Sequence, residues 1–118
     1  MTRTLLTAIF LTLFSQTASA NTVFYCTGTN LVKVEDHKLE KFKTQNFKFS
    51  VNQNTIKFGS GGYFDKHEAG ITRWTDEYNW ASTNNMANIT FLKGYFTSAE
   101  VYSYIDKAFL ITAKCDKF

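Results

Sequence analysis

Apolar and polar residues alternate along several short stretches of the chain, and these stretches predict β-strands. The clearest covers residues 46–58, where Phe47, Phe49 and Val51 alternate with polar residues before an Asn-Gln-Asn turn. A period of two places all the apolar side chains of a strand on one face. The turn between two such segments predicts a β-hairpin.

The same pattern recurs on both sides of this hairpin. We expect Leu31–Glu35 to pair with Leu39–Thr44, Asn88–Leu92 to pair with Tyr95–Tyr102, and Ala108–Lys114 to form the last strand. Residues 97–107 also fit a short helix, because Thr97-Ser98-Ala99-Glu100 matches a capping box, but the β-branched and aromatic pairs that follow favour a strand. Short strands joined by local turns predict an all-β fold: a small single-domain antiparallel β-barrel or sandwich of about seven or eight strands.

Residues 1–20 have the three parts of an export signal. Arg3 is basic, Leu5–Phe14 is mostly apolar, and Ala18-Ser19-Ala20 is a small-residue cleavage site. The apolar part is too short to span a bilayer as a helix. We therefore expect residues 1–20 to be a cleaved signal peptide, residues 21–118 to form one β-rich domain, and the protein to be secreted or periplasmic without stable membrane insertion after cleavage.

Two cysteines, Cys26 and Cys115, lie near the two ends of the expected mature chain. A disulfide is the default state of such a pair in an exported protein. Cys26 shares a strand face with Phe24, and Cys115 shares one with Ile111, so both cysteines should point inward. A bridge between them would place the first strand beside the last strand, or across the core from it.

Charge and motifs exclude several functions. Removal of Arg3 lowers the formal net charge from +3 to +2, which is too weak to indicate nucleic-acid binding. The stretch KFGSGGYF, residues 57–64, lacks the Lys-Ser/Thr and the following helix of a phosphate loop, so we expect its glycines to form a turn or bulge with positive φ. The chain has no His-Glu-x-x-His and no Gly-x-Ser-x-Gly motif. We expect no enzymatic activity, no catalytic residues, no cofactor and no metal.

Aromatic residues give the best functional indication. Five of them fall between residues 63 and 80, where alternation is less regular than in the flanking strands. Rings that stay exposed there could stack on a sugar or anchor a partner protein, although the core also needs large side chains. The candidate binding surface consists of Ser60, Tyr63, Phe64, Trp74, Tyr78 and Trp80.

The overall plan resembles the small periplasmic inhibitors of C-type lysozyme. Those secreted β-barrels open with a Tyr-x-Cys segment, end near a second cysteine, and present a Ser-Gly-x-x-Tyr loop followed by a Lys-Gly loop. Here Phe24-Tyr25-Cys26 lies near the start of the expected mature chain and Cys115 near its end. Ser60-Gly61-Gly62-Tyr63 is one residue shorter than the loop motif, and Lys93-Gly94 lies 33 residues after Ser60. The resemblance implies an inhibitor-like protein with an enzyme as its partner.

Three functions remain open from the sequence. The first is an exported, non-enzymatic binding or inhibitor domain for an unidentified protein or glycan. The second is a lipocalin-like carrier of a small apolar ligand, suggested by the ten phenylalanines that follow residue 20. The third is a small hydrolase using Asp65, His67 and Glu68, which we consider the weakest because no catalytic spacing supports it.

Overall fold

A computed structural model describes residues 22–84, 87–102 and 104–118, and these residues form one antiparallel β-sheet. The expected signal peptide lies outside the described residues. No helix within these ranges is long and apolar enough to cross a membrane. The strands are β1 (Thr22–Glu35), β2 (Lys38–Lys41), β3 (Asn46–Val51), β4 (Thr55–Phe58), β5 (Glu68–Gly70), β6 (Arg73–Asp76), β7 (Asn79–Thr83), β8 (Ala87–Leu92), β9 (Tyr95–Tyr102) and β10 (Lys107–Lys117).

The expected number of strands was wrong. The described part of the chain forms ten strands, not seven or eight. The strands without a clear alternation in the sequence are β5, β6 and β7, which have three, four and five residues. Strands this short contain few positions that can show a period of two, and these three adjoin no clear turn motif in the sequence. Such a strand is recognisable only through the neighbours with which it pairs.

The expected hairpins are confirmed. β3 pairs with β4, β8 pairs with β9, and β1 pairs with β2 in antiparallel registers. The segment that also fitted a helix is a strand as far as Tyr102, and a turn then leads into β10. Residue 103 of that segment lies outside the described residues.

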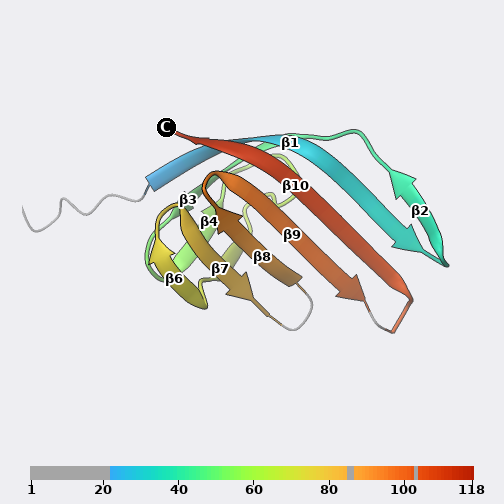
Figure 1. Ribbon diagram of the computed structural model, residues 1–118. Coiled ribbons are helices and arrows are strands. Elements are labelled where there is room, and N and C mark those ends of the chain that lie inside the picture. The colour runs from blue at the N-terminus through green and yellow to red at the C-terminus, as the bar shows by residue number, and fades with distance from the viewer. Residues whose placement is uncertain (1–21, 85–86, 103) are drawn as a thin grey trace, which may run out of the picture.

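The sheet curls into a half-barrel. Its strand order is β5-β4-β3-β1-β10-β9-β8-β7-β6, and β2 adds to β1 outside this path. The two edge strands, β5 and β6, are separated in the chain only by Ile71 and Thr72, so the edges approach each other. Ser82 of β7 donates a hydrogen bond to the carbonyl oxygen of Gly70 in β5 (2.5 Å). Figure 1 shows the strands curved around one interior, with β1 and β10 running across the top.

Packed aromatic rings fill this interior. Phe24, Phe49, Phe91 and Phe96 are at most 1 % exposed. Phe24 lies 4.9 Å from Phe91 and 5.4 Å from Phe49, measured between ring centroids. Each ring comes from an inward position of its strand, because alternate residues of a strand face the same side. Edge-to-face and stacked contacts of this kind stabilise a core beyond the area that they bury.

The predicted disulfide is present between Cys26 and Cys115. The two residues are direct partners in the β1–β10 pairing, with Cα atoms 4.0 Å apart, and both are buried. The first strand therefore lies beside the last one and not across the core from it. The bridge joins two cysteines that are 89 positions apart in the sequence.

Candidate functional site

The structure separates the six candidate residues into buried and accessible ones. Phe64 and Trp80 belong to the core, with 8 % and 2 % exposure, so their rings are not available as a contact surface. Tyr63 and Trp74 are partly buried against that core. Tyr78 is 38 % exposed. Ser60 lies in an exposed bend of the glycine loop.

The glycine loop is a turn, as expected. Gly61 and Gly62 have φ angles of 83° and 81°, which suit glycine far better than other residues. The backbone nitrogen of Gly61 donates to Oδ1 of Asp65 (2.6 Å), and Lys66 donates to the carbonyl oxygen of Gly59 (3.0 Å). No helix follows the loop. Its geometry therefore comes from these contacts within the loop and from contacts with β3, where the carbonyl oxygen of Lys48 accepts a hydrogen bond from Gly59 (3.0 Å).

Tyr63 is also held by the fold. Its hydroxyl oxygen accepts a hydrogen bond from the backbone nitrogen of Gln45, and its ring lies 5.9 Å from that of Phe47. These contacts connect the glycine loop to the segment that precedes β3. Tyr63 thus has a structural role in the same place where the sequence suggested a contact residue.

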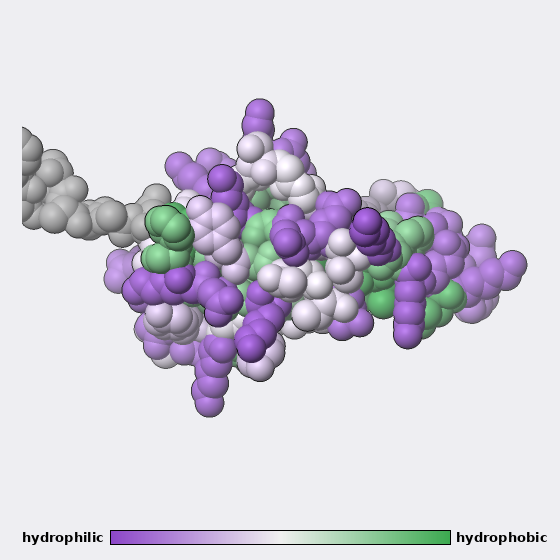
Figure 2. Space-filling model, turned by 90° about the horizontal axis from the view of Figure 1, so that it is seen from above, coloured by the Kyte–Doolittle hydropathy of each residue, from purple (hydrophilic) through white to green (hydrophobic). Residues whose placement is uncertain are grey.

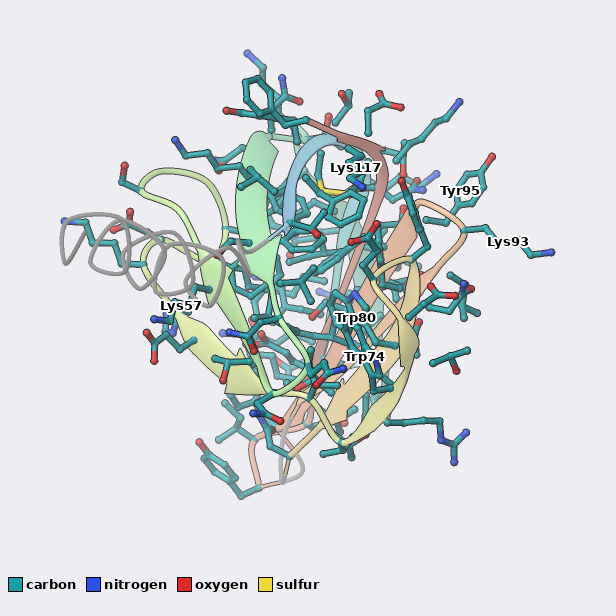
Figure 3. All side chains as sticks on the ribbon, turned by 90° about the vertical axis from the view of Figure 1, so that its left-hand side faces the viewer. Lys57, Trp74, Trp80, Lys93, Tyr95 and Lys117 are labelled. Carbon is teal, nitrogen blue, oxygen red and sulfur yellow. A yellow bond between two sulfur atoms is a disulfide. The ribbon has the colours of Figure 1, made fainter. Side chains whose placement is uncertain are left out.

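Two of the candidate residues, Trp74 and Tyr78, line an open cavity of the half-barrel. This cavity has a volume of about 1060 Å³ and lies at one end of the half-barrel, between the β3–β4 and β6–β7 turns. We call it the end groove. Figure 3 faces this end and shows Trp74 beside Trp80. Its lining residues are Thr22, Val51, Asn52, Gln53, Asn54, Thr55, Trp74, Thr75, Asp76, Glu77 and Tyr78.

Side-chain hydrogen bonds fix both turns that border the end groove. Oδ1 of Asn52 accepts from the backbone nitrogens of Asn54 (2.8 Å) and Thr55 (2.9 Å). Oδ1 of Asp76 accepts from the backbone nitrogen of Tyr78 (2.8 Å). Asn and Asp stabilise turns in this way because their short side chains reach the backbone two or three residues on. The two walls are therefore positioned before any ligand arrives.

Glu77 connects one wall to the first and last strands of the chain, β1 and β10, which are neighbours in the sheet. Its carboxylate accepts a hydrogen bond from Thr22 at the start of β1 (2.5 Å) and pairs with Lys117 at the end of β10 (2.9 Å). The hydrogen bonds from Lys117 and Thr22 lower the pKa of Glu77, and the bond to Glu77 raises the pKa of Lys117. Both groups are therefore charged over a wide range around neutral pH.

Tyr78 stands between the core and the end groove. Its ring makes an edge-to-face contact with Phe24 (5.5 Å), and the ammonium group of Lys117 lies 5.8 Å from the ring centroid. These contacts hold the ring in place while more than a third of the residue remains exposed. A ring fixed in this way loses little conformational entropy when a ligand packs on it.

The residues of the hydrolase hypothesis take part in contacts within the loop and with β4. Asp65 accepts the hydrogen bond from Gly61, and Glu68 pairs with Lys57 (3.8 Å). His67 uses its backbone nitrogen to bond the carbonyl oxygen of Phe64 (2.8 Å). Within the described ranges, no group of three or more His, Cys, Asp or Glu side chains could hold a metal ion.

The two loops of the inhibitor resemblance lie on opposite sides of β1. Gly94 of the Lys93-Gly94 turn accepts a hydrogen bond from Cys115 of β10, and Gly62 packs against Phe47 of β3. β1 runs between β10 and β3 at this level, with Cys26 opposite both Cys115 and Phe47. Sheet strands therefore separate the loops, and an inhibitory role for them stays a prediction.

The polar half of the end groove was not predicted from the sequence. Asn52, Gln53 and Asn54 were interpreted only as a hairpin turn, and Glu77 was not among the candidate residues. Turn residues give no sign of which other turn they will face, because this depends on how the whole sheet curls.

No known protein family, curated protein or solved structure matches this chain.

Proposed function

We propose that this protein is an exported, non-enzymatic binding domain that holds a glycan in the end groove. The observation that carries this proposal is the groove itself: about 1060 Å³ of accessible volume between two fixed turns, with Trp74 and Tyr78 on one wall and side-chain amides on the other. This volume is at the upper limit of ordinary ligand sites. Export is supported by the expected signal peptide and by the disulfide.

The lining of the end groove suits sugars. The side chains of Gln53 and Asn54 offer amide donors and acceptors for hydroxyl groups, and Thr75 adds a hydroxyl of its own. The aromatic rings of Trp74 and Tyr78 offer apolar faces on which the carbon–hydrogen side of a sugar ring can pack. Glu77 adds a charged acceptor whose orientation is fixed by Thr22 and Lys117.

The filled interior argues against the lipocalin-like carrier. A carrier needs an apolar cavity inside the barrel, whereas here rings from several strands pack against one another at the centre. Close-packed side chains leave no room for a ligand of useful size. The end groove is instead open and partly polar, and it lies at the end of the half-barrel and not inside it.

A protein partner is the second candidate, and one observation favours it. Leu92 and Tyr95 face each other across the β8–β9 hairpin and are 57 % and 60 % exposed. Figure 3 shows Lys93 and Tyr95 pointing away from the body of the molecule. Exposed apolar side chains at a protruding turn are suitable contacts for another protein. The side chains of Leu92 and Tyr95 do not line the end groove, although the backbone nitrogen of Lys93 donates a hydrogen bond to the carbonyl oxygen of Tyr78 (3.0 Å). Substitutions of these two side chains can therefore distinguish the two candidates.

Glycan binding is tested on an array of immobilised oligosaccharides of about two to six sugars, a length that about 1060 Å³ can accommodate in part. We expect selective binding to one class of sugar. Tyr78→Ala and Gln53→Ala should each weaken binding of that sugar by about tenfold. Tyr95→Ala is the matched control, because it removes an exposed aromatic ring outside the groove and should leave binding unchanged. Loss of binding only in Tyr95→Ala, or no retained sugar, contradicts the proposal.

A further inference from the structure

Part of the sheet continues beyond the half-barrel. Past an irregularity in the register between Gly28 and Asn30, the second half of β1 pairs with β2 on one side and β10 on the other. We call this region, together with the end of β9, the extension. β2 is its outer strand: within the described residues it pairs with β1 alone, and all four of its residues are exposed. Its outer edge therefore presents backbone groups that can accept another strand.

One face of the extension carries charges that alternate in sign from strand to strand. Lys33 of β1 lies opposite Glu40 of β2, and Glu35 of β1 lies between Lys38 of β2 and Lys107 of β10. The ion pairs Lys33–Glu40 (3.9 Å), Lys33–Glu35 (3.5 Å) and Lys107–Glu35 (3.8 Å) join these positions. These charged residues form rows that run across the strands, and we call them the charge ladder. Each row ends at β2, with Glu40 in one row and Lys38 in the next.

The opposite face of the extension is apolar. A single row across its four strands consists of Leu39, Val34, Ala108 and Val101. Leu39, Val34 and Val101 are 62 %, 39 % and 58 % exposed. Figure 2 shows apolar side chains gathered toward the right-hand end, which in Figure 1 is the end where β2 lies. This row also stops at β2, where Leu39 is its last residue.

We propose that β2 pairs with β2 of a second copy of this chain, antiparallel and centred on Leu39. In that register Lys38 of one copy lies opposite Glu40 of the other, twice, because an antiparallel pair with a two-fold axis repeats each contact. The charge ladder then continues with alternating sign across the junction. The two Leu39 side chains come together on the other face, so that the apolar row of one copy continues into that of the second.

The net charge of this part of the chain favours a second copy over a charged partner. Residues 31–42 contain three lysines and three acidic residues, so two copies meet here without net repulsion. A strongly acidic or basic partner would gain nothing from a neutral surface. The four residues of β2 form a short junction, so the dimer is weak, with a dissociation constant between about 10 µM and 1 mM.

Sedimentation velocity of the purified protein over a series of concentrations tests this pairing. Lys38→Glu places a glutamate opposite Glu40 of the other copy in both of the symmetric pairs, and Glu40→Lys places a lysine opposite Lys38 in both. Each variant alone should raise the dimer dissociation constant by about tenfold. An equimolar mixture of the two variants restores both opposite-charge pairs across the junction, whereas the like-charge contacts with Glu35 and Lys33 inside each copy remain. Its dissociation constant should therefore fall back from the raised values toward the wild-type value. Lys93→Glu, an equal charge change on the β8–β9 turn, is the control and should have no effect.

Three results would overturn the proposal. The first is a protein that stays monomeric up to about 1 mM. The second is a dimer whose dissociation constant is the same in the wild type and in both variants, and the third is a mixture of the two variants that dimerises no more tightly than either variant alone.

Amide hydrogen exchange tests the same contact independently. Exchange at Leu39 and Lys41, whose backbone nitrogens point away from β1, should slow as the protein concentration rises, whereas exchange in β5, the edge strand of the half-barrel, should not change.

Discussion

At the scale of single residues, the burial of a side chain follows from its position in a strand, because alternate residues of a regular strand face the same side. Phe47, Phe49 and Val51 are buried, as their alternation indicated. Phe64 and Trp80 were placed on a candidate surface but lie in the core. Phe64 belongs to a turn, where no period of two applies. Trp80 lies in a strand of five residues, and its inward direction depends on a pairing that the sequence does not show.

The two positive-φ glycines offer a matched pair of substitutions. A Cβ atom at Gly61 would meet nothing within 4 Å, whereas one at Gly62 would lie 2.9 Å from Cβ of Phe47 and 3.0 Å from the carbonyl oxygen of Asn46. Gly61→Ala should therefore cost about 1 kcal/mol through backbone conformation alone. Gly62→Ala should cost about 2–4 kcal/mol, since a steric clash with β3 adds to the same penalty. Urea denaturation measures both values, and equal losses would contradict the close contact between the loop and β3.

At the scale of elements, the hairpins were predicted and the curl of the sheet was not. Turn chemistry and alternation are local, and they indicated the β1–β2, β3–β4 and β8–β9 pairs. The position of the β6–β7 turn opposite the β3–β4 turn follows from long-range pairing. So does the contact of Glu77 with Thr22 and Lys117, which are 55 and 40 residues away in the chain.

The contact of Glu77 with Thr22 and Lys117, which we call the clamp, predicts how the stability of the protein changes in acid. The pKa of Glu77 is lower in the folded protein than its ordinary value of 4.5, because Lys117 and Thr22 hydrogen-bond the carboxylate. A lowered folded-state pKa contributes stability that is present above the unfolded-state pKa and is lost as the pH falls through the folded-state value. Glu77→Gln should therefore show a smaller loss of stability than the wild type between about pH 5 and about pH 3.

Thermal unfolding at several pH values measures this difference. Glu68→Gln is the control: it removes a carboxylate whose ion pair with Lys57 is longer (3.8 Å) and more exposed. That variant should follow the wild-type acid profile. Parallel profiles for the wild type and Glu77→Gln would mean that the clamp does not form in solution.

At the scale of the whole molecule, the sequence indicated the class of fold and its covalent closure. One antiparallel sheet and the Cys26–Cys115 bridge between the first and last strands are both present. The end groove was beyond sequence reasoning, because its walls come from segments about 20 residues apart that meet only when the sheet curls. The candidate site was therefore predicted only through Trp74 and Tyr78.

Removal of the disulfide should lower the stability of the entire sheet. Replacing Cys26 and Cys115 together with alanine frees a loop closed over 89 positions, which the chain-entropy account values at about 4–5 kcal/mol. The far-ultraviolet circular dichroism of the folded variant should remain that of a β-sheet, because the β1–β10 hydrogen bonds do not depend on sulfur. An unchanged free energy of unfolding would show that the bridge does not constrain the unfolded chain as this account requires.

The central claim is that a ligand binds between the two turns at the end of the half-barrel, and an NMR titration tests it most directly. Backbone amide signals of the labelled protein are followed while the oligosaccharide selected on the array is added. We predict that the shifted signals cluster at residues 52–55 and 74–78, the two walls of the end groove. A cluster at the β8–β9 turn or in the loop of residues 59–64, with the groove signals unchanged, would contradict it.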